Sequence, residues 1–192
     1  MDRRDILKIG AAAGVAALLT DAVQAAAPPD GKPGDFVQAA APPDGKPGDF
    51  DFLAGNWSIK HRRLKAPGDW DLFDGEATCW TILGGVGSVE ELRIPARSFA
   101  GMGLRLLDVG NKIWSDFWVN AKSGVLTTPG LTGAFQDGAG VFVADDVDGD
   151  RPIKVRSVWD RITPKSCRWH QAVSYDAGKT WAENWNMDWT RI

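Results

Sequence analysis

The stretch that decides the fold is "GNWSIKHRRLKAPGDWDLFDGEATCWTIL", residues 55–83. Apolar and polar side chains alternate near its beginning and again near its end, which is typical of strands that turn one face toward a core. Ala-Pro-Gly-Asp at 66–69 lies between the two runs and favours a tight turn. We therefore predict strands at Trp57–Lys65 and Gly75–Leu83 that pair as an antiparallel hairpin.

The same pattern continues to the end of the chain. Short alternating runs are separated about every eight to twelve residues by turn sequences rich in Gly, Asp and Asn, and no run has the period of an amphipathic helix. The other predicted strands are Ser88–Pro95, Phe99–Asp108, Lys112–Asn120, Leu131–Gln136, Val141–Asp146, Pro152–Ile162, Cys167–Tyr175 and Trp181–Arg191. About ten antiparallel strands with short links predict an all-β fold, an up-and-down barrel whose closure removes exposed sheet edges.

Two residues at opposite ends of this region carry a family resemblance. Gly55-x-Trp57 in the first predicted strand resembles the G-x-W signature of lipocalins and other calycins. The resemblance implies that Trp57 plugs one end of the barrel and that Arg191, in the last strand, packs over it. The barrel region also resembles a bacterial calycin-like family called domain of unknown function 1579, distantly similar to nitrobindins, through the motifs "LGG", "FAG", "IWSDFW", "GAFQDG", "RSVWDRI" and "SYDAGKTW". This family implies a barrel and has no established reaction.

The first hairpin offers a candidate acid/base pair. If Trp57 points inward, alternation also carries His61 inward. A register that places Trp57 opposite Trp80 places His61 opposite Glu76, and a His beside a carboxylate is suited to proton transfer near neutral pH. The alternative is a salt-linked pair at the barrel rim.

Three further carboxylates share strand faces with apolar residues. Asp116 and Glu183 each lie between tryptophans, and Glu90 alternates with Leu92. Buried charges are costly unless they are paired, so we expect each carboxylate near a barrel mouth or held by an Arg or a ligand. The face of Asp116 is left open, because Phe117 belongs to an equally apolar row.

Tryptophan is the most unusual feature of the composition, with ten Trp beside a single Tyr. So many indoles favour an aromatic-lined pocket, and barrels of this kind offer a concave apolar cavity. We predict that the protein binds a small hydrophobic or aromatic molecule between Trp80, Trp118, Trp159, Trp169 and Trp185. One alternative is a cofactor-independent isomerase or hydratase whose catalytic residues are His61, Glu76, Asp116 and Glu183. Another is a barrel whose interior is completely filled.

No cofactor or metal is predicted. If Trp169 points inward, His170 points outward, which disfavours haem and leaves nitrobindin-like haem binding as a further alternative. Cys79 and Cys167 suit buried strand positions as small apolar residues, with a disulfide between them as the alternative. The chain has no Cys/His cluster for zinc and no G-x-S-x-G nucleophile motif.

The stretch "SYDAGKTW", residues 174–181, has the spacing of an Asp-box, the hairpin turn that recurs in sialidase propellers. A propeller needs several repeated blades, and nothing in this chain recurs at that period. We therefore interpret the motif as a structural turn between two strands, in which Asp176 accepts local hydrogen bonds and Gly178 takes a positive φ. The alternative is a sugar-contact loop.

The N-terminus resembles a twin-arginine export signal, with Arg3 and Arg4 before a weakly hydrophobic stretch. We predict a signal peptide at 1–26, a disordered linker at 27–50 and the barrel at 51–192. The segment 23–36 recurs unchanged at 37–50 and is rich in Pro, Gly and Ala. A net charge of −3 favours neither nucleic acid nor an anionic membrane as partner. We expect a periplasmic protein without a stable membrane anchor after signal removal, and the oligomeric state is left open.

Overall fold

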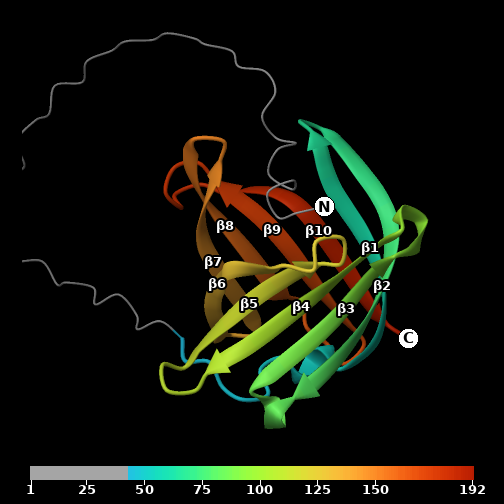
Figure 1. The fold of residues 1–192 in the computed structure, drawn as a ribbon, viewed down its shortest axis with the longest axis vertical. Coiled ribbons are helices and arrows are strands. Elements are labelled where there is room, and N and C mark those ends of the chain that lie inside the picture. The colour runs from blue at the N-terminus through green and yellow to red at the C-terminus, as the bar shows by residue number, and fades with distance from the viewer. Residues whose placement is uncertain (1–42) are drawn as a thin grey trace, which may run out of the picture.

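Residues 43–192 of the protein are described by a computed structural model, and they form a closed antiparallel β-barrel (Figure 1). Each strand pairs with its neighbours in sequence, and the last strand pairs with the first. The strands are β1 (Gly55–Ala66), β2 (Asp69–Ile82), β3 (Gly87–Ile94), β4 (Phe99–Asp108), β5 (Ile113–Asn120), β6 (Leu126–Gln136), β7 (Ala139–Asp148), β8 (Arg151–Asp160), β9 (Ser166–Ser174) and β10 (Ala182–Arg191). Three short 3₁₀ helices complete the fold: η1 (Asp51–Leu53), η2 (Leu83–Gly85) and η3 (Pro95–Arg97). The predicted all-β barrel is confirmed.

The register of the first hairpin differs from the prediction. Trp57 pairs with Ala77 rather than Trp80, and His61 pairs with Phe73 rather than Glu76. β2 begins at Asp69 because the turn holds only Pro67 and Gly68, where Gly68 has a φ of 80°. Since a shift by an odd number of residues exchanges the two faces of a strand, the predicted inner row of β2 lies outside.

One end of the barrel is closed by η1 and the residues before it, at the bottom of Figure 1. Phe50 and Leu53 are buried there, and Phe50 packs edge-on against Trp114 with ring centroids 4.9 Å apart. Backbone hydrogen bonds from Gly45 to Lys112 and from Gly48 to Gly85 attach the preceding segment to strand ends. Residues 43–50, which the sequence assigns to the linker, belong to the packed structure. The predictions for residues 1–42 lie outside the described residues.

The contact implied by the G-x-W resemblance is present at this closed end. The guanidinium carbon of Arg191 lies 4.3 Å from the ring centroid of Trp57. The same guanidinium donates hydrogen bonds to the carbonyls of Ala54 and Phe52, and Trp57 Nε1 donates to the Leu53 carbonyl at 2.7 Å. The predicted packing of Arg191 over Trp57 is confirmed, and it joins the last strand to the N-terminal plug.

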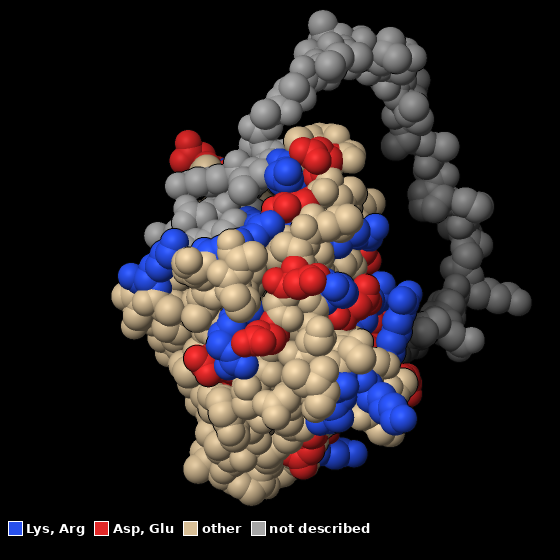
Figure 2. Space-filling view, turned by 90° about the vertical axis from the view of Figure 1, so that its right-hand side faces the viewer, with Lys and Arg blue, Asp and Glu red and all other residues tan. Residues whose placement is uncertain are grey.

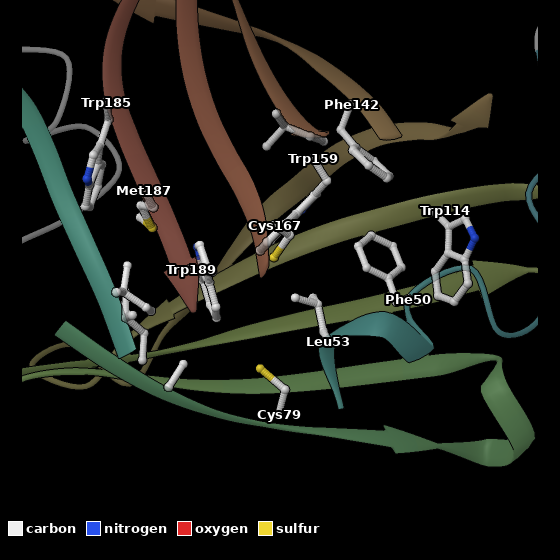
Figure 3. Packing of buried hydrophobic residues seen from close by; sticks show 14 of the residues in the cluster. Phe50, Leu53, Cys79, Trp114, Phe142, Trp159, Cys167, Trp185, Met187 and Trp189 are labelled. Carbon is white, nitrogen blue, oxygen red and sulfur yellow. The ribbon is translucent and has the colours of Figure 1, made fainter. Parts of the chain in front are cut away.

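The interior is a single aromatic-rich core. Figure 3 shows Trp185, Met187 and Trp189 in a row along β10, with Phe50 and Trp114 toward the closed end. Cys79 and Cys167 are free thiols in this core. Burial raises the pKa of Cys79, and it raises the pKa of Cys167 to about 12, so both remain protonated and pack as small apolar groups.

The Asp-box is a structural turn in the β9–β10 hairpin, as the sequence predicts. Asp176 accepts hydrogen bonds from the backbone N–H and the hydroxyl of Thr180 and from the hydroxyl of Ser174. Gly178 has a φ of 95°, and Trp181 Nε1 donates to the Gly178 carbonyl. These bonds lie within the hairpin, which accounts for the motif through turn geometry alone.

The outer surface carries charges of both signs. On the face shown in Figure 2, Lys and Arg are interspersed with Asp and Glu among uncharged residues. Ion pairs such as Lys60–Asp74 join neighbouring strands on the outside of the barrel. Within residues 43–192, no helix is long and apolar enough to span a membrane.

Candidate functional site

A cavity lies inside the barrel, with a volume of about 80 Å³ in which the centre of a water molecule can move. Since at least 10–15 Å³ of such space is needed to hold one water, the cavity has room for a few waters or a small ligand. Its walls come from seven strands, β3, β4, β5, β6, β8, β9 and β10, and combine apolar side chains with a few polar ones. The lining residues are Glu90, Leu92, Arg105, Asp116, Phe117, Trp118, Leu131, Ser157, Trp159, Trp169, Gln171, Trp185, Met187 and Trp189.

Tryptophan side chains form most of the aromatic wall. Trp159 and Trp189 meet edge to face with centroids 5.3 Å apart, and Trp169 meets Trp185 in the same way at 5.8 Å. Trp118 also lines the cavity. Trp118, Trp159, Trp169 and Trp185 were all predicted from the sequence to share a pocket, and the structure brings these four together.

The predicted inward position of Trp80 is wrong. Trp80 keeps 47 % of its surface exposed and lines a shallow groove on the outside of the barrel with Val89 and Met102. The cause is the register of β2, which turns Ala77 and Cys79 inward and Trp80 outward. The small inward side chains of Ala77 and Cys79 leave room for the large side chains of β1 and β10.

A buried ion triad crosses three adjacent strands at the cavity. Arg105 of β4 donates to Glu90 of β3 at 2.5 Å, and its Nε lies 3.4 Å from Asp116 of β5. Burial raises the pKa of Glu90 above its ordinary value, with Arg105 opposing the shift. Burial alone would lower the pKa of Arg105, but the two carboxylates raise it, so the guanidinium stays charged. The expectation that Glu90 and Asp116 need a cation is thus met by Arg105.

Glycines at inward positions of β4 make room for these groups. A Cβ at Gly103 would lie 3.0 Å from Nη2 of Arg105 and 3.3 Å from Oε2 of Glu90. A Cβ at Gly101 would overlap the ring of Trp118. In the sequence "GMGLR", Gly101 and Gly103 have no side chains on the inner face, and this leaves space for the rings and for Arg105. Sequence reasoning missed this pattern.

Five buried polar atoms of the lining residues have no hydrogen-bond partner within the described residues. They are Nε and Nη1 of Arg105, Oγ of Ser157, Nε1 of Trp159 and Nε1 of Trp189. Each can donate a hydrogen bond, and a buried donor without a partner costs about 1–3 kcal/mol. Ser157 and Trp189 were not predicted as site residues. Alternation could have predicted both positions, because Ser157 lies on the same strand face as Trp159 and Trp189 lies on the same strand face as Trp185.

His61 is buried, but it is not one of the residues that line the cavity. Its ring stacks on Phe73 at 4.5 Å, and its Nδ1 accepts a hydrogen bond from Nε1 of Trp185 at 3.2 Å. Burial, followed by the charge of Arg97, lowers the pKa of His61 to about 3. The imidazole is therefore neutral, with its remaining hydrogen on Nε2, facing Gly75.

The structure does not bring the four predicted catalytic residues together. Glu76 lies on the outer face of β2, where Arg93 donates to it at 2.9 Å, so the predicted His61–Glu76 pair is wrong. Glu183 lies on the outer face beside a register shift of β10 and contacts Nδ1 of His170 at 3.3 Å. Asp116 alone of the four lines the cavity. The other polar residues that line the cavity are Glu90, Arg105, Ser157 and Gln171.

His170 lies on the outer face of β9, as predicted. Its ring nitrogens approach Asp160 and Glu183, and its neighbours Trp169 and Gln171 line the cavity from the opposite face. This position does not fit an axial ligand to a haem inside the barrel. Within residues 43–192, no group of three His, Cys, Asp or Glu side chains is placed to hold a metal ion.

The end of the barrel opposite the closed end carries basic side chains. A second hollow there is lined by Arg63, Arg97 and Lys122 together with aromatic rings, among them Trp185. Arg97 stacks on Phe73 at 3.6 Å and pairs with Asp71 at 2.7 Å. Trp185 is thus a wall of both the inner cavity and this basic mouth.

Comparisons with known proteins support export. Residues 1–20 match the family model of the twin-arginine translocation pathway signal sequence, so the chain carries a signal for export across the cytoplasmic membrane. The search of curated proteins gave no match.

Two solved structures are similar in outline. One is EF1p2_mFAP2b bound to DFHBI, at 10 % identity and a TM-score of 0.39, covering 76 % of this chain and 98 % of that one. The other is a protein of unknown function from the DUF3598 family of Nostoc punctiforme, at 11 % identity and a TM-score of 0.41, covering 80 % of this chain and 53 % of that one. The fold assignment rests on the strand pairing itself, since both TM-scores are low.

Proposed function

We propose that this exported barrel binds a small neutral aromatic molecule in its inner cavity. The observation that carries the proposal is a shared hollow of about 80 Å³ walled by Trp118, Trp159, Trp169 and Trp185. Aromatic walls with a few polar groups are typical of small-molecule sites, because the apolar walls supply affinity and the polar groups fix orientation. The small volume of the hollow limits the ligand to one no larger than a single ring.

The remaining organisation of the chain follows the same proposal. The signal segment and the linker deliver the barrel to the periplasm, and the barrel alone carries the binding site. The Trp57–Arg191 contact agrees with the resemblance to lipocalins and other calycins, which supports this view. The isomerase or hydratase alternative loses its basis, since His61, Glu76 and Glu183 do not reach the hollow that Asp116 lines.

Calorimetric titration of the purified protein with neutral single-ring compounds tests the proposal. The panel contains ethylbenzene, anisole and acetophenone, and we expect saturable binding of at least one of them. Trp169→Ala removes a cavity wall and should weaken that binding by about tenfold or more, since a buried ring contributes a few kcal/mol. Trp80→Ala is the matched control, because Trp80 lies outside the cavity. Absence of binding across the panel, or an equal loss in both variants, contradicts the proposal.

A further inference from the structure

The basic mouth of the barrel is the larger of the two hollows that share Trp185. The centre of a water molecule can move through about 110 Å³ of it, against about 80 Å³ in the inner cavity. Arg63, Arg97 and Lys122 line this mouth, and no Asp or Glu of residues 43–192 is among its lining residues. The inner cavity, in contrast, has two carboxyl groups beside one guanidinium. The two hollows therefore differ in charge, and the basic mouth attracts anions.

Two of the three basic side chains are accessible to solvent. The side chain of Arg97 is 35 % exposed, and within residues 43–192 its one hydrogen-bond partner is Asp71, which Nη2 reaches at 2.7 Å. A guanidinium carries five N–H donors, so Nε and Nη1 remain for another acceptor. Lys122 is exposed, and no carboxylate in the described part of the chain lies within 4 Å of its ammonium group. Both cations can therefore receive a ligand from solution.

Arg97 and Lys122 lie at neighbouring strand ends. Arg97 ends η3 just before β4, and Lys122 follows β5, the strand that pairs with β4. The backbone N–H of Ala121 donates to the Ala100 carbonyl at 3.1 Å, so the pairing of the two strands continues up to Lys122. Both side chains line the basic mouth from this edge. A carboxylate has two accepting oxygens, so a single one suits two neighbouring cations.

Aromatic rings form much of the remaining wall. The guanidinium carbon of Arg97 lies 3.6 Å from the ring centroid of Phe73, and that of Arg63 lies 5.2 Å from the ring centroid of Trp185. Phe99 lines the basic mouth as well. Stacking on a ring helps to hold each guanidinium in place. The rings also offer apolar surface, which a ligand with an aromatic body buries and an inorganic anion does not.

We propose that the basic mouth is a second binding site, which takes a small aromatic carboxylate. The carboxylate group pairs with Arg97 and Lys122, and the ring packs against the aromatic walls. Arg63, which is only 5 % exposed, adds positive charge on the inner side of the site. This site is separate from the inner cavity, so the inference does not depend on whether the inner cavity binds a neutral ligand.

Titration of ¹⁵N-labelled protein with benzoate, benzyl alcohol and inorganic phosphate, followed by nuclear magnetic resonance of the backbone amides, tests the site. Benzoate should bind about tenfold more tightly than benzyl alcohol, which lacks the charge, and more tightly than phosphate, which lacks the ring. The signals of Arg97, Phe99 and Lys122 should move most, and those of Ser157 and Trp159 in the inner cavity should hardly move.

Three results would overturn the inference. Benzoate that fails to bind removes the site, and benzyl alcohol or phosphate that binds as tightly as benzoate shows that the mouth does not select an aromatic anion. Largest shifts at Ser157 and Trp159 would place the carboxylate in the inner cavity instead.

Variants that remove one charge each give a second test. Lys122→Gln should weaken benzoate binding by about twofold or more, and Arg97→Gln by about fivefold or more, because Arg97 is the less exposed cation. Lys165→Gln is the matched control and should leave the affinity unchanged. It changes the net charge equally, but Lys165 lies at the closed end, where its carbonyl accepts from the backbone N–H of Arg191.

Lys122→Gln still decides the test if Arg97→Gln fails to fold, since Lys122 is exposed and has no carboxylate within 4 Å among residues 43–192. Unchanged affinity for benzoate in the mouth variants that fold contradicts the inference. An equal loss in Lys165→Gln would also contradict it, because the overall charge of the protein, and not the basic mouth, would then attract the anion.

Discussion

At the scale of single residues, His61 shows how burial changes the chemistry that a sequence suggests. The sequence predicts a histidine that exchanges protons near neutral pH. The structure places the ring between Phe73 and Trp185, where burial lowers its pKa to about 3. The hydrogen bond from Trp185 fixes the neutral form, so His61 positions an indole that forms part of the cavity wall.

This environment predicts a pH dependence of stability. The unfolded chain binds a proton at His61 below a pH of about 6.5, whereas the folded protein does so only near 3. Between these values the unfolded state binds more protons, so the free energy of unfolding decreases as the pH falls. From pH 7 to pH 4.5 the loss due to His61 is about 2–3 kcal/mol.

Denaturant unfolding of wild type and His61→Gln at both pH values measures this loss. The glutamine side chain retains an oxygen that can accept from Trp185, and it does not titrate. The variant should therefore lose about 2–3 kcal/mol less than wild type on acidification, while every other titrating group contributes equally to both proteins. Identical losses would mean that the ring is solvated in the folded state.

Residue roles that follow from a sequence motif, or from alternation within one strand, could be predicted. Roles that depend on the register between two strands could not. The contact between Trp57 and Arg191 follows from the G-x-W resemblance, and the outward position of His170 follows from alternation within one strand. Trp80 was misplaced because its face depends on pairing with another strand. Arg105 was missed because an arginine in a strand is usually a surface residue, and only the glycines at 101 and 103 mark the space that it fills.

At the scale of elements, the β9–β10 hairpin is stabilised by its own turn. Hydrogen bonds from Thr180, and then from Ser174, lower the pKa of Asp176 to about 2. A carboxylate with a depressed pKa stabilises the fold at a pH above about 4, and this contribution disappears as the pH falls from about 4 toward 2. The turn is therefore most stable when Asp176 is ionised.

Asp176→Asn should lower the midpoint temperature of unfolding at pH 7, because the amide loses the charge and one of the accepting oxygens. The difference from wild type should shrink as the pH is lowered below about 4. Asp137→Asn is the matched control, since Asp137 lies in the β6–β7 turn with a φ of 52°, a conformation that Asn tolerates. Thermal unfolding followed by circular dichroism measures both. A similar effect in the two variants would show that the charge, and not the turn, matters.

The existence of all ten strands could be predicted, whereas their register could not. Period-two alternation and turn residues mark where a strand lies, and the strands at 99–108 and 113–120 agree closely with the structure. Register depends on turn length and on bulges. The β1–β2 turn is tighter than predicted, and β5 pairs with β6 across a register shift between Asp116 and Trp118. The candidate site was therefore predicted for four tryptophans and Asp116, and it was missed for Arg105, Ser157 and Trp189.

At the scale of the whole molecule, the barrel depends on the pairing of its first and last strands. Ile59 pairs with Trp189, and Arg191 joins β10 to the plug through Ala54 and Phe52. Trp189 is only 1 % exposed and packs on both Trp57 and Trp159. Removing this strand end takes away packing in the centre of the core as well as the closing hydrogen bonds.

Deletion of residues 189–192 should therefore abolish the cooperative unfolding transition. Loss of a buried Trp alone costs about 3–5 kcal/mol, a large part of the roughly 5–15 kcal/mol that stabilises a typical domain. Deletion of Ile192 alone is the control, since this residue is largely exposed and contributes one backbone hydrogen bond to Asn56. A calorimetric scan of each protein shows whether the transition survives. A transition of normal enthalpy in the longer deletion would contradict the role assigned to the strand end.

The pairing of β10 with β1 also has a consequence for biosynthesis. While β10 is still inside the ribosome, β1 and β9 each lack the partner strand that pairs with their backbone groups in the closed barrel. A polypeptide that stalls before this strand therefore differs from the closed barrel, because its unpaired strand edges can bind chaperones and proteases. A twin-arginine translocase, which carries folded cargo, meets a closed form of this protein only after β10 has been made.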